Sequence, residues 1–363
     1  MTYFLRIIIV CLTLCSMALA QPNLKRGVNL SHWYAQSTDG DYSEPKLSTY
    51  FTSADVQLIK QMGFDHVRLT LNDEVVFQTI GKLKADNVDR LRKRIDAFVD
   101  AGLNVIVDLH PETKFKERLA TPMGAAALVA DWHALATALA DTDPDKVALE
   151  VLNEPDPMTA DQWRGVQLAV VRVMRAAAPK HTIIVSPGGW TSADDLIKFI
   201  PYEGIDRLVY TFHFYDPHLY THQSAGWAWV VAQRVGGIDW PIEPARADAV
   251  ANEVAKDDEA RGHVRWQIQH GQFADDSIRT SLQRVADWQK KHGVDVYAGE
   301  FGVYRHTAVR AGYLRWHTTV RETFEQHGWG WAVWDYAGGF AVAPGKPGAR
   351  VPDAEMLKAL GLR

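Results

Sequence analysis

The fold of this chain is most constrained by a repeated unit in which a helical pattern ends at a glycine and an apolar run follows. Gly63, Gly102, Gly293 and Gly328 lead into the runs FDHVRLTL, LNVIVDLH, VDVYAGEF and WGWAVWDY. Glycine just past the end of a helix suits the left-handed cap conformation, and near-continuous apolar runs are typical of strands buried on both faces. The unit therefore predicts parallel strands that alternate with helices.

Eight such strands are predicted along the chain, with helical patterns between them. The strands cover residues 26–30, 65–70, 104–109, 147–152, 182–186, 207–214, 294–298 and 330–334. The helices cover residues 54–62, 88–101, 125–140, 160–178, 193–199, 278–292, 309–327 and 354–360. This alternation over 363 residues predicts a single-domain α/β fold, the (β/α)8 or TIM barrel. A doubly wound open sheet is the alternative, but RGVNLSHW, which contains the first strand, carries no Gly-rich phosphate-binding motif.

The first twenty residues have the three parts of a cleavable signal peptide. Arg6 supplies a basic start, IIIVCLTLCSMALA is apolar, and Ala18 and Ala20 form an A-x-A cleavage pattern. The apolar run is short for a helix that spans a membrane. We therefore expect residues 1–20 to be removed, and residues 21–363 to form one catalytic domain that is secreted or periplasmic and free of the membrane.

Charge and cysteine content bear on two further classes of protein. The formal net charge is −5 and no basic cluster stands out, so we expect no nucleic-acid partner. The two cysteines, Cys11 and Cys15, both lie in the predicted signal peptide, which leaves no disulfide and no thiol catalyst after cleavage. We expect the mature chain to be a monomer.

One segment interrupts the alternation, because residues 215–276 separate the sixth predicted strand from its helix. The segment contains Trp227, Trp229, Trp240 and Trp266, and a short helical pattern near residues 245–254. An insertion of this length in a compact domain is usually functional or disordered, and its tryptophans argue against disorder. We therefore expect a folded, functional insertion.

Polar and aromatic side chains mark the ends of seven of the eight predicted strands. In a TIM barrel the carboxyl ends of the strands converge on the face that carries the active site. Any one of these residues, taken alone, is more easily explained as a structural hydrogen-bonding group, but their convergence favours a functional site. The set comprises Asn29, His32, Trp33, Arg68, Asp108, His110, Asn153, Glu154, His213, Tyr215, Glu300 and Trp334.

Two carboxylates of this set, Glu154 and Glu300, follow strands on opposite sides of the predicted barrel. Paired carboxylates are what cleavage of a glycosidic bond requires, one to protonate the leaving oxygen and one to attack the anomeric carbon. Their mutual repulsion is expected to raise the pKa of one carboxyl group, and Arg68 to hold that of the other low. The competing interpretation is a divalent-metal site with His110 and His213. The first strand has no H-x-H and no helix has H-E-x-x-H, so we expect no metal and no cofactor.

The aromatic content favours a sugar ligand, since apolar sugar faces stack on indole rings. The chain has 13 tryptophans. Four of them lie on predicted helices and are expected to be core residues, namely Trp132, Trp163, Trp288 and Trp316. Six fall at strand ends or in loops and are candidates for sugar stacking, namely Trp33, Trp190, Trp227, Trp229, Trp240 and Trp334.

The motif LEVLNEP and the order of the strand-end residues resemble glycoside hydrolase family 5, and the resemblance extends over residues 26–362. It implies that Glu154 is the acid/base, that Glu300 is the nucleophile and that Arg68 holds the nucleophile. It also implies that Asn153 hydrogen-bonds the sugar 2-hydroxyl. The other matching positions, which are expected to bind substrate, are His110, His213, Tyr215 and, as a stacking platform, Trp334.

The reaction that the resemblance implies is retaining double displacement. Glu154 protonates the glycosidic oxygen while Glu300 attacks, and water activated by Glu154 then releases the sugar. Retaining enzymes need their two carboxyl groups about 5 Å apart, which is the separation that we expect.

The resemblance leaves the sugar open. RGVNLSHW is similar to the opening of exo-β-1,3-glucanases, whereas YTHQSAGW is similar to a loop of bacterial endoglucanase-like members. We expect a polysaccharide or oligosaccharide substrate of the β-glucan class and, within it, an endo-β-1,4-glucanase activity. Exo-β-1,3-glucanase and β-mannanase are the alternatives within the family. A carbohydrate-binding barrel without catalysis is the alternative of another class, and the intact Glu154 and Glu300 argue against it.

Overall fold

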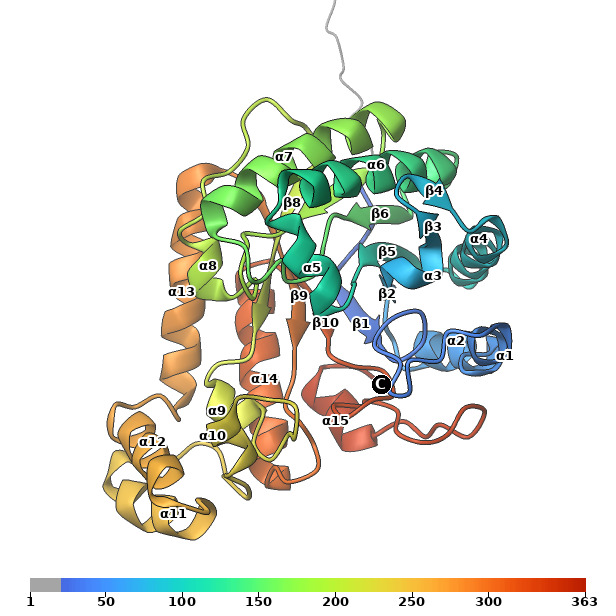
Figure 1. Ribbon diagram of the computed structural model, residues 1–363. Helices are drawn as coiled ribbons and strands as arrows, with labels where there is room; N and C mark the ends of the chain where they lie inside the picture. Colours follow the sequence, from blue (N-terminus) through green and yellow to red (C-terminus); the bar gives the residue numbers. More distant parts are fainter. Residues whose placement is uncertain (1–20) are drawn as a thin grey trace, which may run out of the picture.

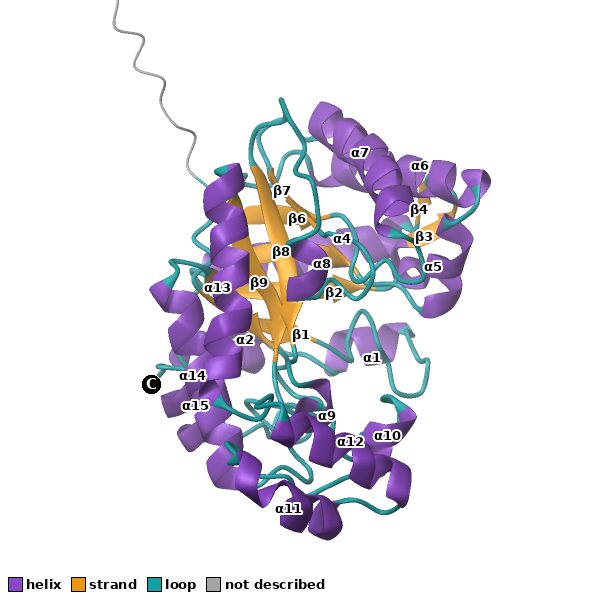
Figure 2. Ribbon diagram, turned by 90° about the vertical axis from the view of Figure 1, so that its left-hand side faces the viewer, coloured by secondary structure: helices purple, strands orange, loops and turns teal. Residues whose placement is uncertain are grey.

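The computed structural model describes residues 21–363, so the predicted signal peptide lies outside the described residues. Eight parallel strands close into a barrel in the order β1-β10-β9-β8-β7-β6-β5-β2 (Figures 1 and 2). The strands are β1 Arg26–Leu30, β2 His66–Leu71, β5 Asn104–Leu109, β6 Val147–Glu150, β7 Thr182–Val185, β8 Leu208–Phe214, β9 Asp295–Phe301 and β10 Gly330–Val333. The predicted TIM barrel is confirmed, and each predicted strand overlaps one of these eight.

Helices surround the barrel and fill the connections between its strands (Figure 1). The first half contains α1 Glu44–Thr49, α2 Ser53–Gln61, α3 Asp73–Val76, α4 Ala85–Asp100, α5 Thr113–Leu119, α6 Pro122–Leu139 and α7 Ala160–Ala177. A small antiparallel hairpin of β3 Phe77–Thr79 and β4 Lys82–Leu83 lies between α3 and α4. The second half contains α8 Ala193–Leu196, α13 Asp275–His292, α14 Arg310–Gln326 and α15 Ala354–Ala359.

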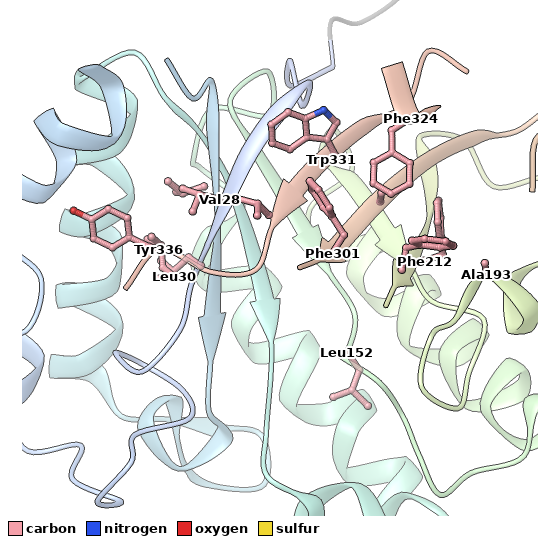
Figure 3. Close-up of a cluster of buried hydrophobic side chains, with 14 of the residues drawn as sticks. Val28, Leu30, Leu152, Ala193, Phe212, Phe301, Phe324, Trp331 and Tyr336 are labelled. Carbon is pink, nitrogen blue, oxygen red and sulfur yellow. The ribbon is translucent and has the colours of Figure 1, made fainter. Parts of the chain in front are cut away.

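The main hydrophobic core lies between the outer face of the barrel and the helices, as the apolar strands predict. Figure 3 shows part of it, where Phe301 of β9 lies beside Trp331 of β10 and Phe324 of α14. The ring centroids of Phe301 and Phe324 are 5.3 Å apart in an edge-to-face arrangement, which is favourable for aromatic pairs. Helix α14 is therefore fixed against the strand that carries Glu300.

The inside of the barrel has an apolar layer below a polar one. The apolar layer comprises Ile106, Ala148, Ile184, Val209, Tyr297 and Ala332. Because side chains alternate along a strand, Asp108 and Glu150 point inward two residues beyond Ile106 and Ala148. Both carboxylates are buried. They form the floor beneath the carboxyl ends of the strands, where the catalytic residues are predicted.

Gly27 in β1 makes room for an inward-pointing histidine at the other end of the barrel. A Cβ at Gly27 would lie 2.1 Å from the Nε2 atom of His66, its partner across the β1–β2 ladder. The same Nε2 lies 2.7 Å from the hydroxyl of Tyr297. The glycine is therefore required by close packing across the barrel.

The insertion between β8 and α13 is folded, as its tryptophans predict. It contains α9 His218–Thr221, α10 Val230–Gln233, the 3-10 turn η1 Pro244–Arg246, α11 Ala247–Val254 and α12 Asp258–Gln269. In Figure 1 these helices form a lobe at the lower left, below α13 and beside the lower part of α14. Trp240 anchors the lobe, since it is buried against Tyr220 and Phe273. Within residues 21–363, no helix combines the length and the apolar character needed to cross a membrane.

Candidate active site

A cleft of about 620 Å³ opens at the carboxyl ends of the barrel strands and extends onto the insertion. Most of the residues predicted for the site reach it from different strands. Those that line it are His110, Asn153, Glu154, His213, Tyr215, Glu300 and Trp334. These strand-end residues therefore meet in one cleft, as the barrel topology predicts.

Glu154 and Glu300 face one another in this cleft. Glu300 lies within β9, whereas Glu154 lies four residues after the end of β6 and has a φ of 40°. Such a backbone conformation is uncommon outside glycine and is found where function requires a particular side-chain direction. One oxygen of each carboxylate and a ring nitrogen of His213 all lie within 4.8 Å of one another. The expected separation of about 5 Å is consistent with this geometry.

Arg68 lies beneath the cleft and holds Glu300. Its Nη1 donates to the Oε1 of Glu300 at 2.7 Å and to the Oδ1 of Asn29 at 2.9 Å. Its other side makes two bonds of 2.8 Å to Glu150, and Asp108 lies at 3.0 Å. Burial raises the pKa of Asp108 to about 6 and also raises that of Glu150, although the charge of Arg68 opposes both shifts. Arg68 is fully buried, so it positions Glu300 from below.

A second chain of hydrogen bonds orients Asn153. The Nδ1 of His110 lies 2.8 Å from the Oδ2 of Asp108, and its Nε2 lies 3.0 Å from the Nδ2 of Asn153. Burial lowers the pKa of His110 to about 3, so the imidazole is neutral near neutral pH. A neutral ring with its proton on Nδ1 donates to Asp108 and accepts from Asn153. Because Arg68 donates to the Oδ1 of Asn153 at 3.0 Å, both ends of the amide are fixed.

His213 contacts both glutamates and changes the expected charge balance. Its Nδ1 lies 2.9 Å from the Oε1 of Glu154 and 3.5 Å from the Oε2 of Glu300. Burial alone would raise the pKa of Glu154, but the hydrogen bond and charge of His213 lower it to about 2. Burial alone would lower the pKa of His213, but the two carboxylates raise it. The expectation that repulsion raises the pKa of one glutamate is therefore not met at Glu154, because an imidazolium lies beside it.

Tyr215 and Trp334 complete the surroundings of the two glutamates. The hydroxyl of Tyr215 donates to the Oε2 of Glu300 at 2.9 Å. Burial and the neighbouring carboxylates raise the pKa of Tyr215 well above its ordinary value, so the phenol stays a donor. The ring of Trp334 stacks on His110, with centroids 5.7 Å apart, and forms part of the cleft wall.

Trp33 is not part of the cleft, so its prediction as a substrate-binding residue is wrong. Its side chain is fully buried and stacks on Phe51, with ring centroids 4.7 Å apart. The indole Nε1 donates to the backbone oxygen of Leu47 at 2.9 Å. The chain after β1 turns at His32 and Gln36, which both have positive φ, and the second of these reaches the cleft instead. Trp240 is likewise a core residue, as described above.

Several cleft residues were not predicted from the sequence. They lie in the connections that follow β1, β8 and β10, and they are Gln36, Asp216, His218, His222 and Phe340. The rings of His218 and His222 stack with centroids 3.9 Å apart. The sequence signal that could have identified these two histidines is the spacing HLYTH, which places them on one side of a helical turn. Of the tryptophans predicted in loops, Trp190, Trp227 and Trp229 do line the cleft.

The group formed by Glu154, His213 and Glu300 also has the spacing of a possible cation site. Each member already has a protein partner. Glu154 is paired with His213, and Glu300 is held by Arg68 and Tyr215. A cation would compete with the positive charges of the imidazolium and the guanidinium. The arrangement therefore favours direct acid–base and nucleophilic chemistry by the two glutamates.

A TIM barrel that brings two carboxylates together at the strand ends, in a cleft walled by tryptophans, has the fold and site of a glycoside hydrolase. The comparison with known families agrees. The chain belongs to the cellulase family, glycosyl hydrolase family 5, whose family model matches residues 26–339. It is therefore a glycoside hydrolase.

Similar proteins include two bacterial endoglucanases. Endoglucanase C of Acetivibrio thermocellus is 24% identical over 323 residues, which cover 86% of this chain and 91% of that protein. Endoglucanase 3 of Fibrobacter succinogenes is 25% identical over 343 residues, which cover 89% of this chain. This second match spans about half, 51%, of the length of the Fibrobacter protein.

Solved structures share the fold. Cel5A of Thermotoga maritima in complex with cellobiose superposes with a TM-score of 0.75 at 22% identity, covering 93% of this chain and 97% of that one. The cellulose synthase subunit Z, CcsZ, of Clostridioides difficile superposes with a TM-score of 0.75 at 23% identity, covering 93% and 99%.

Proposed function

We propose that this protein is a retaining endo-β-1,4-glucanase, with Glu154 as acid/base and Glu300 as nucleophile. The observation that carries the proposal is the approach of the two carboxylates, which place an oxygen each within 4.8 Å of one another. That distance suits direct attack by a carboxylate and leaves too little room for the water molecule of an inverting enzyme. The names of the similar endoglucanases support the choice of β-1,4-glucan.

In the first step Glu300 attacks the anomeric carbon while Glu154 gives a proton to the glycosidic oxygen. The bond between that carbon and oxygen breaks, and a glycosyl ester of Glu300 forms. In the second step Glu154 removes a proton from water, which attacks the same carbon and restores the Glu300 carboxylate. Two inversions at one carbon retain its configuration.

The proton for the first step is held between Glu154 and His213. In the free protein their pKa values, lowered for Glu154 and raised for His213, place it on the imidazole. Formation of the glycosyl ester removes the negative charge of Glu300, which lies 3.5 Å from the same Nδ1. Loss of that charge weakens the hold of the imidazole on its proton. That proton can then pass along the 2.9 Å hydrogen bond to Glu154, which delivers it to the leaving oxygen.

The nucleophile is prepared by Arg68 and Tyr215, which contact different oxygens of Glu300. The two bonds fix the rotation of the carboxylate and stabilise its charge before attack. When the ester forms, the phenol of Tyr215 stays close to the reacting oxygen. Asn153, fixed by Arg68 and His110, presents its amide to the cleft, where it can bind a sugar hydroxyl.

The proposal is tested by measuring hydrolysis of β-1,4-glucan, β-1,3-glucan, mixed-linkage glucan and mannan by the wild type and by Glu300→Gln. The Glu300→Gln variant is expected to lose activity on every substrate that the wild type cleaves. Glu203→Gln, which removes a carboxylate from an exposed loop, is the matched control and should leave activity unchanged. Preference for mannan or β-1,3-glucan would overturn the proposed specificity. Full activity of Glu300→Gln would overturn the mechanism.

Two further measurements address the other classes of protein. A carbohydrate-binding barrel without catalysis would bind glucan but release no reducing sugar. A metal-dependent hydrolase would lose activity on dialysis against a chelator, whereas the proposed mechanism requires activity to persist.

We also propose that the protein is exported and acts as a monomer. The basic start, apolar run and A-x-A pattern of residues 1–20 support export. Sequencing of the mature N-terminus after expression in a host with a Sec pathway should give Gln21 as the first residue. Light scattering should give the mass of one chain.

A further inference from the structure

The exposed tryptophans of this protein are concentrated around the cleft, with one exception. Among the described residues, which include all 13 tryptophans, four are exposed. Trp190, Trp227 and Trp229 line the cleft, with exposed fractions of 63%, 65% and 45%. The fourth, Trp266, is 52% exposed and lies on α12 of the insertion, outside the cleft. The catalytic site therefore does not explain why the side chain of Trp266 is exposed.

Trp266 belongs to a row of rings that begins at the cleft. Trp229, in the cleft wall, packs edge-on against His263 of α12, with ring centroids 4.9 Å apart. His263 and Trp266 are three residues apart on the same helix, so they share a face. The ring of Trp266 then stacks on His270, with centroids 4.2 Å apart. Trp229, His263, Trp266 and His270 are called the aromatic strip below.

The aromatic strip lies on the side of α12 that faces away from the core. The buried side of the helix carries Ala260, Val264 and Ile268, which repeat every fourth residue and pack inward. From His263 to His270 the strip extends over seven residues, or about 10 Å along the helix axis. Figure 2 shows α12 beside α10 at the lower end of the molecule, and Trp229, the residue before α10, lines the cleft. The strip therefore continues the cleft over the insertion.

We infer that the aromatic strip binds the outlying part of a long glucan chain whose other part occupies the catalytic cleft. The inference rests on the proposed function and deepens it, because it makes a polymer a better substrate than a short oligosaccharide. An indole ring offers a flat apolar surface to the CH face of a sugar. The neighbouring imidazoles offer ring nitrogens to the hydroxyl groups at the edge of that sugar. The ring of Trp266 is already held by His270, so little rotational freedom is lost when a sugar stacks on it.

The charges near the strip favour this neutral ligand over a charged one. Arg265 is paired with Asp248, and Glu259 is paired with Arg234. Arg234 is also paired with Asp257, so both arginines are already held in ion pairs and neither is available to an anionic partner. The strip is also one ring wide and interrupted by imidazoles, unlike the broad apolar patch of a protein or membrane contact.

The strip is tested by its effect on binding of a polymer in the absence of turnover. Glu300→Gln and Glu300→Gln/Trp266→Ala are compared by electrophoresis in native gels that contain increasing concentrations of hydroxyethylcellulose, a neutral soluble β-1,4-glucan. Loss of one stacking platform is expected to raise the dissociation constant roughly three- to tenfold. Ile80→Ala in the same background is the control, because Ile80 is an exposed apolar residue of the β3–β4 turn, and should not change it.

Kinetics then separate the strip from the catalytic site. In otherwise wild-type protein, Trp266→Ala should lower the ratio of kcat/KM on hydroxyethylcellulose to kcat/KM on cellotetraose by roughly three- to tenfold. An unchanged ratio and unchanged gel retardation, with cellotetraose still cleaved by the wild type, would overturn the strip and leave the proposed function standing. Failure of the wild type to cleave either substrate would overturn both. A thermal melt of Trp266→Ala checks that any loss is not caused by unfolding.

Discussion

The Nδ1 of His213 lies 2.9 Å from the Oε1 of Glu154, so the proposed acid/base is paired with an imidazole that also faces the proposed nucleophile. The pair shares one proton. Because the carboxylates raise the pKa of His213 above its ordinary 6.5, the proton leaves the imidazole only as the pH rises through that raised pKa. The basic limb of the pH–rate profile should therefore report His213.

The first prediction concerns His213→Gln. Without the imidazolium, burial of Glu154 is no longer offset, so the pKa of Glu154 rises from its lowered value and Glu154 alone must hold the catalytic proton. The basic limb of kcat/KM should move to lower pH, and the loss of activity should be larger at pH 8 than at pH 5. The profile is measured on a soluble oligosaccharide from pH 4 to pH 9. A uniform loss of rate at every pH would indicate a purely structural role for His213.

The second prediction distinguishes the roles of the two glutamates by chemical rescue. Glu154→Ala should still cleave an aryl cellobioside with a good leaving group, because that first step needs no acid, and should then stall at the glycosyl ester. Azide should restore its turnover and give a glycosyl azide of retained configuration. Loss of acid/base assistance on natural substrate should cost about 10²–10⁴-fold in kcat.

The matching Glu300→Ala variant has no nucleophile, and azide can take its place only by direct attack. Its product should be the glycosyl azide of inverted configuration. Proton NMR of the anomeric position distinguishes the two products. The reverse pattern, with inversion from Glu154→Ala, would exchange the assigned roles.

The barrel and the pair of glutamates could be predicted from the sequence because both depend on the pattern of the strands and not on the conformation of single loops. The apolar strands fix which residues lie at the carboxyl ends, and the topology brings those ends together. Glu154, Glu300 and Arg68 therefore meet as expected. The direction of a side chain within a loop has no such constraint. Trp33 and Gln36 are three residues apart, and the turns between them decided which one reaches the cleft.

The proton balance could not be predicted for a different reason. His213 and Glu154 come from different strands, and the expected repulsion between the glutamates assumed no cation between them. A shift of a few ångströms in the imidazole decides whether the pKa of Glu154 rises or falls. The role of Glu150 could not be predicted either. It lies within the LEVLNEP motif, but its two hydrogen bonds with Arg68 depend on how the two side chains meet inside the barrel.

The third prediction concerns Arg68→Lys. A lysine keeps the charge but cannot make the forked bonds that reach Glu150 and Glu300 together. Buried carboxylates left without partners should lower the free energy of unfolding by about 3–5 kcal/mol, and kcat should fall because Glu300 is no longer fixed. Urea denaturation and steady-state kinetics measure the two effects. Arg92→Lys, in the more exposed pair with Asp141, is the control and should change stability by less than about 1 kcal/mol.

The fourth prediction follows from the correction at Trp33. Trp33→Phe removes the hydrogen bond from the indole to Leu47 and leaves a buried carbonyl without its donor, so stability should fall by about 1–3 kcal/mol. The KM of Trp33→Phe should equal that of the wild type. Trp334→Phe, which changes the cleft wall, should raise KM instead. A raised KM for Trp33→Phe would restore Trp33 to the substrate site.

The last prediction concerns the pair of Asp55 and Arg350, which ties α2 to the loop before α15. The Nη1 of Arg350 donates to the Oδ1 of Asp55 at 2.7 Å, and the hydroxyl of Tyr336 donates to the same oxygen at 2.8 Å. Both members of the pair are buried. Asp55→Asn should lower the free energy of unfolding at pH 7 by about 3–5 kcal/mol, since it leaves the arginine charge buried without a partner.

The dependence of this effect on pH follows from the pKa of Asp55. Burial alone would raise that pKa, but Arg350 and the other donors lower it below the ordinary 3.8. The stabilisation is thus fully present above pH 3.8 and is lost as the pH falls through the lowered value. The difference between wild type and Asp55→Asn in urea denaturation should be constant from pH 7 to pH 5 and shrink below pH 3.8. Asp276→Asn, in an exposed pair on α13, should show a difference below about 1 kcal/mol throughout. A gap between wild type and Asp55→Asn that persists undiminished at pH 2 would show that the charge of Asp55 is not what stabilises this corner of the barrel.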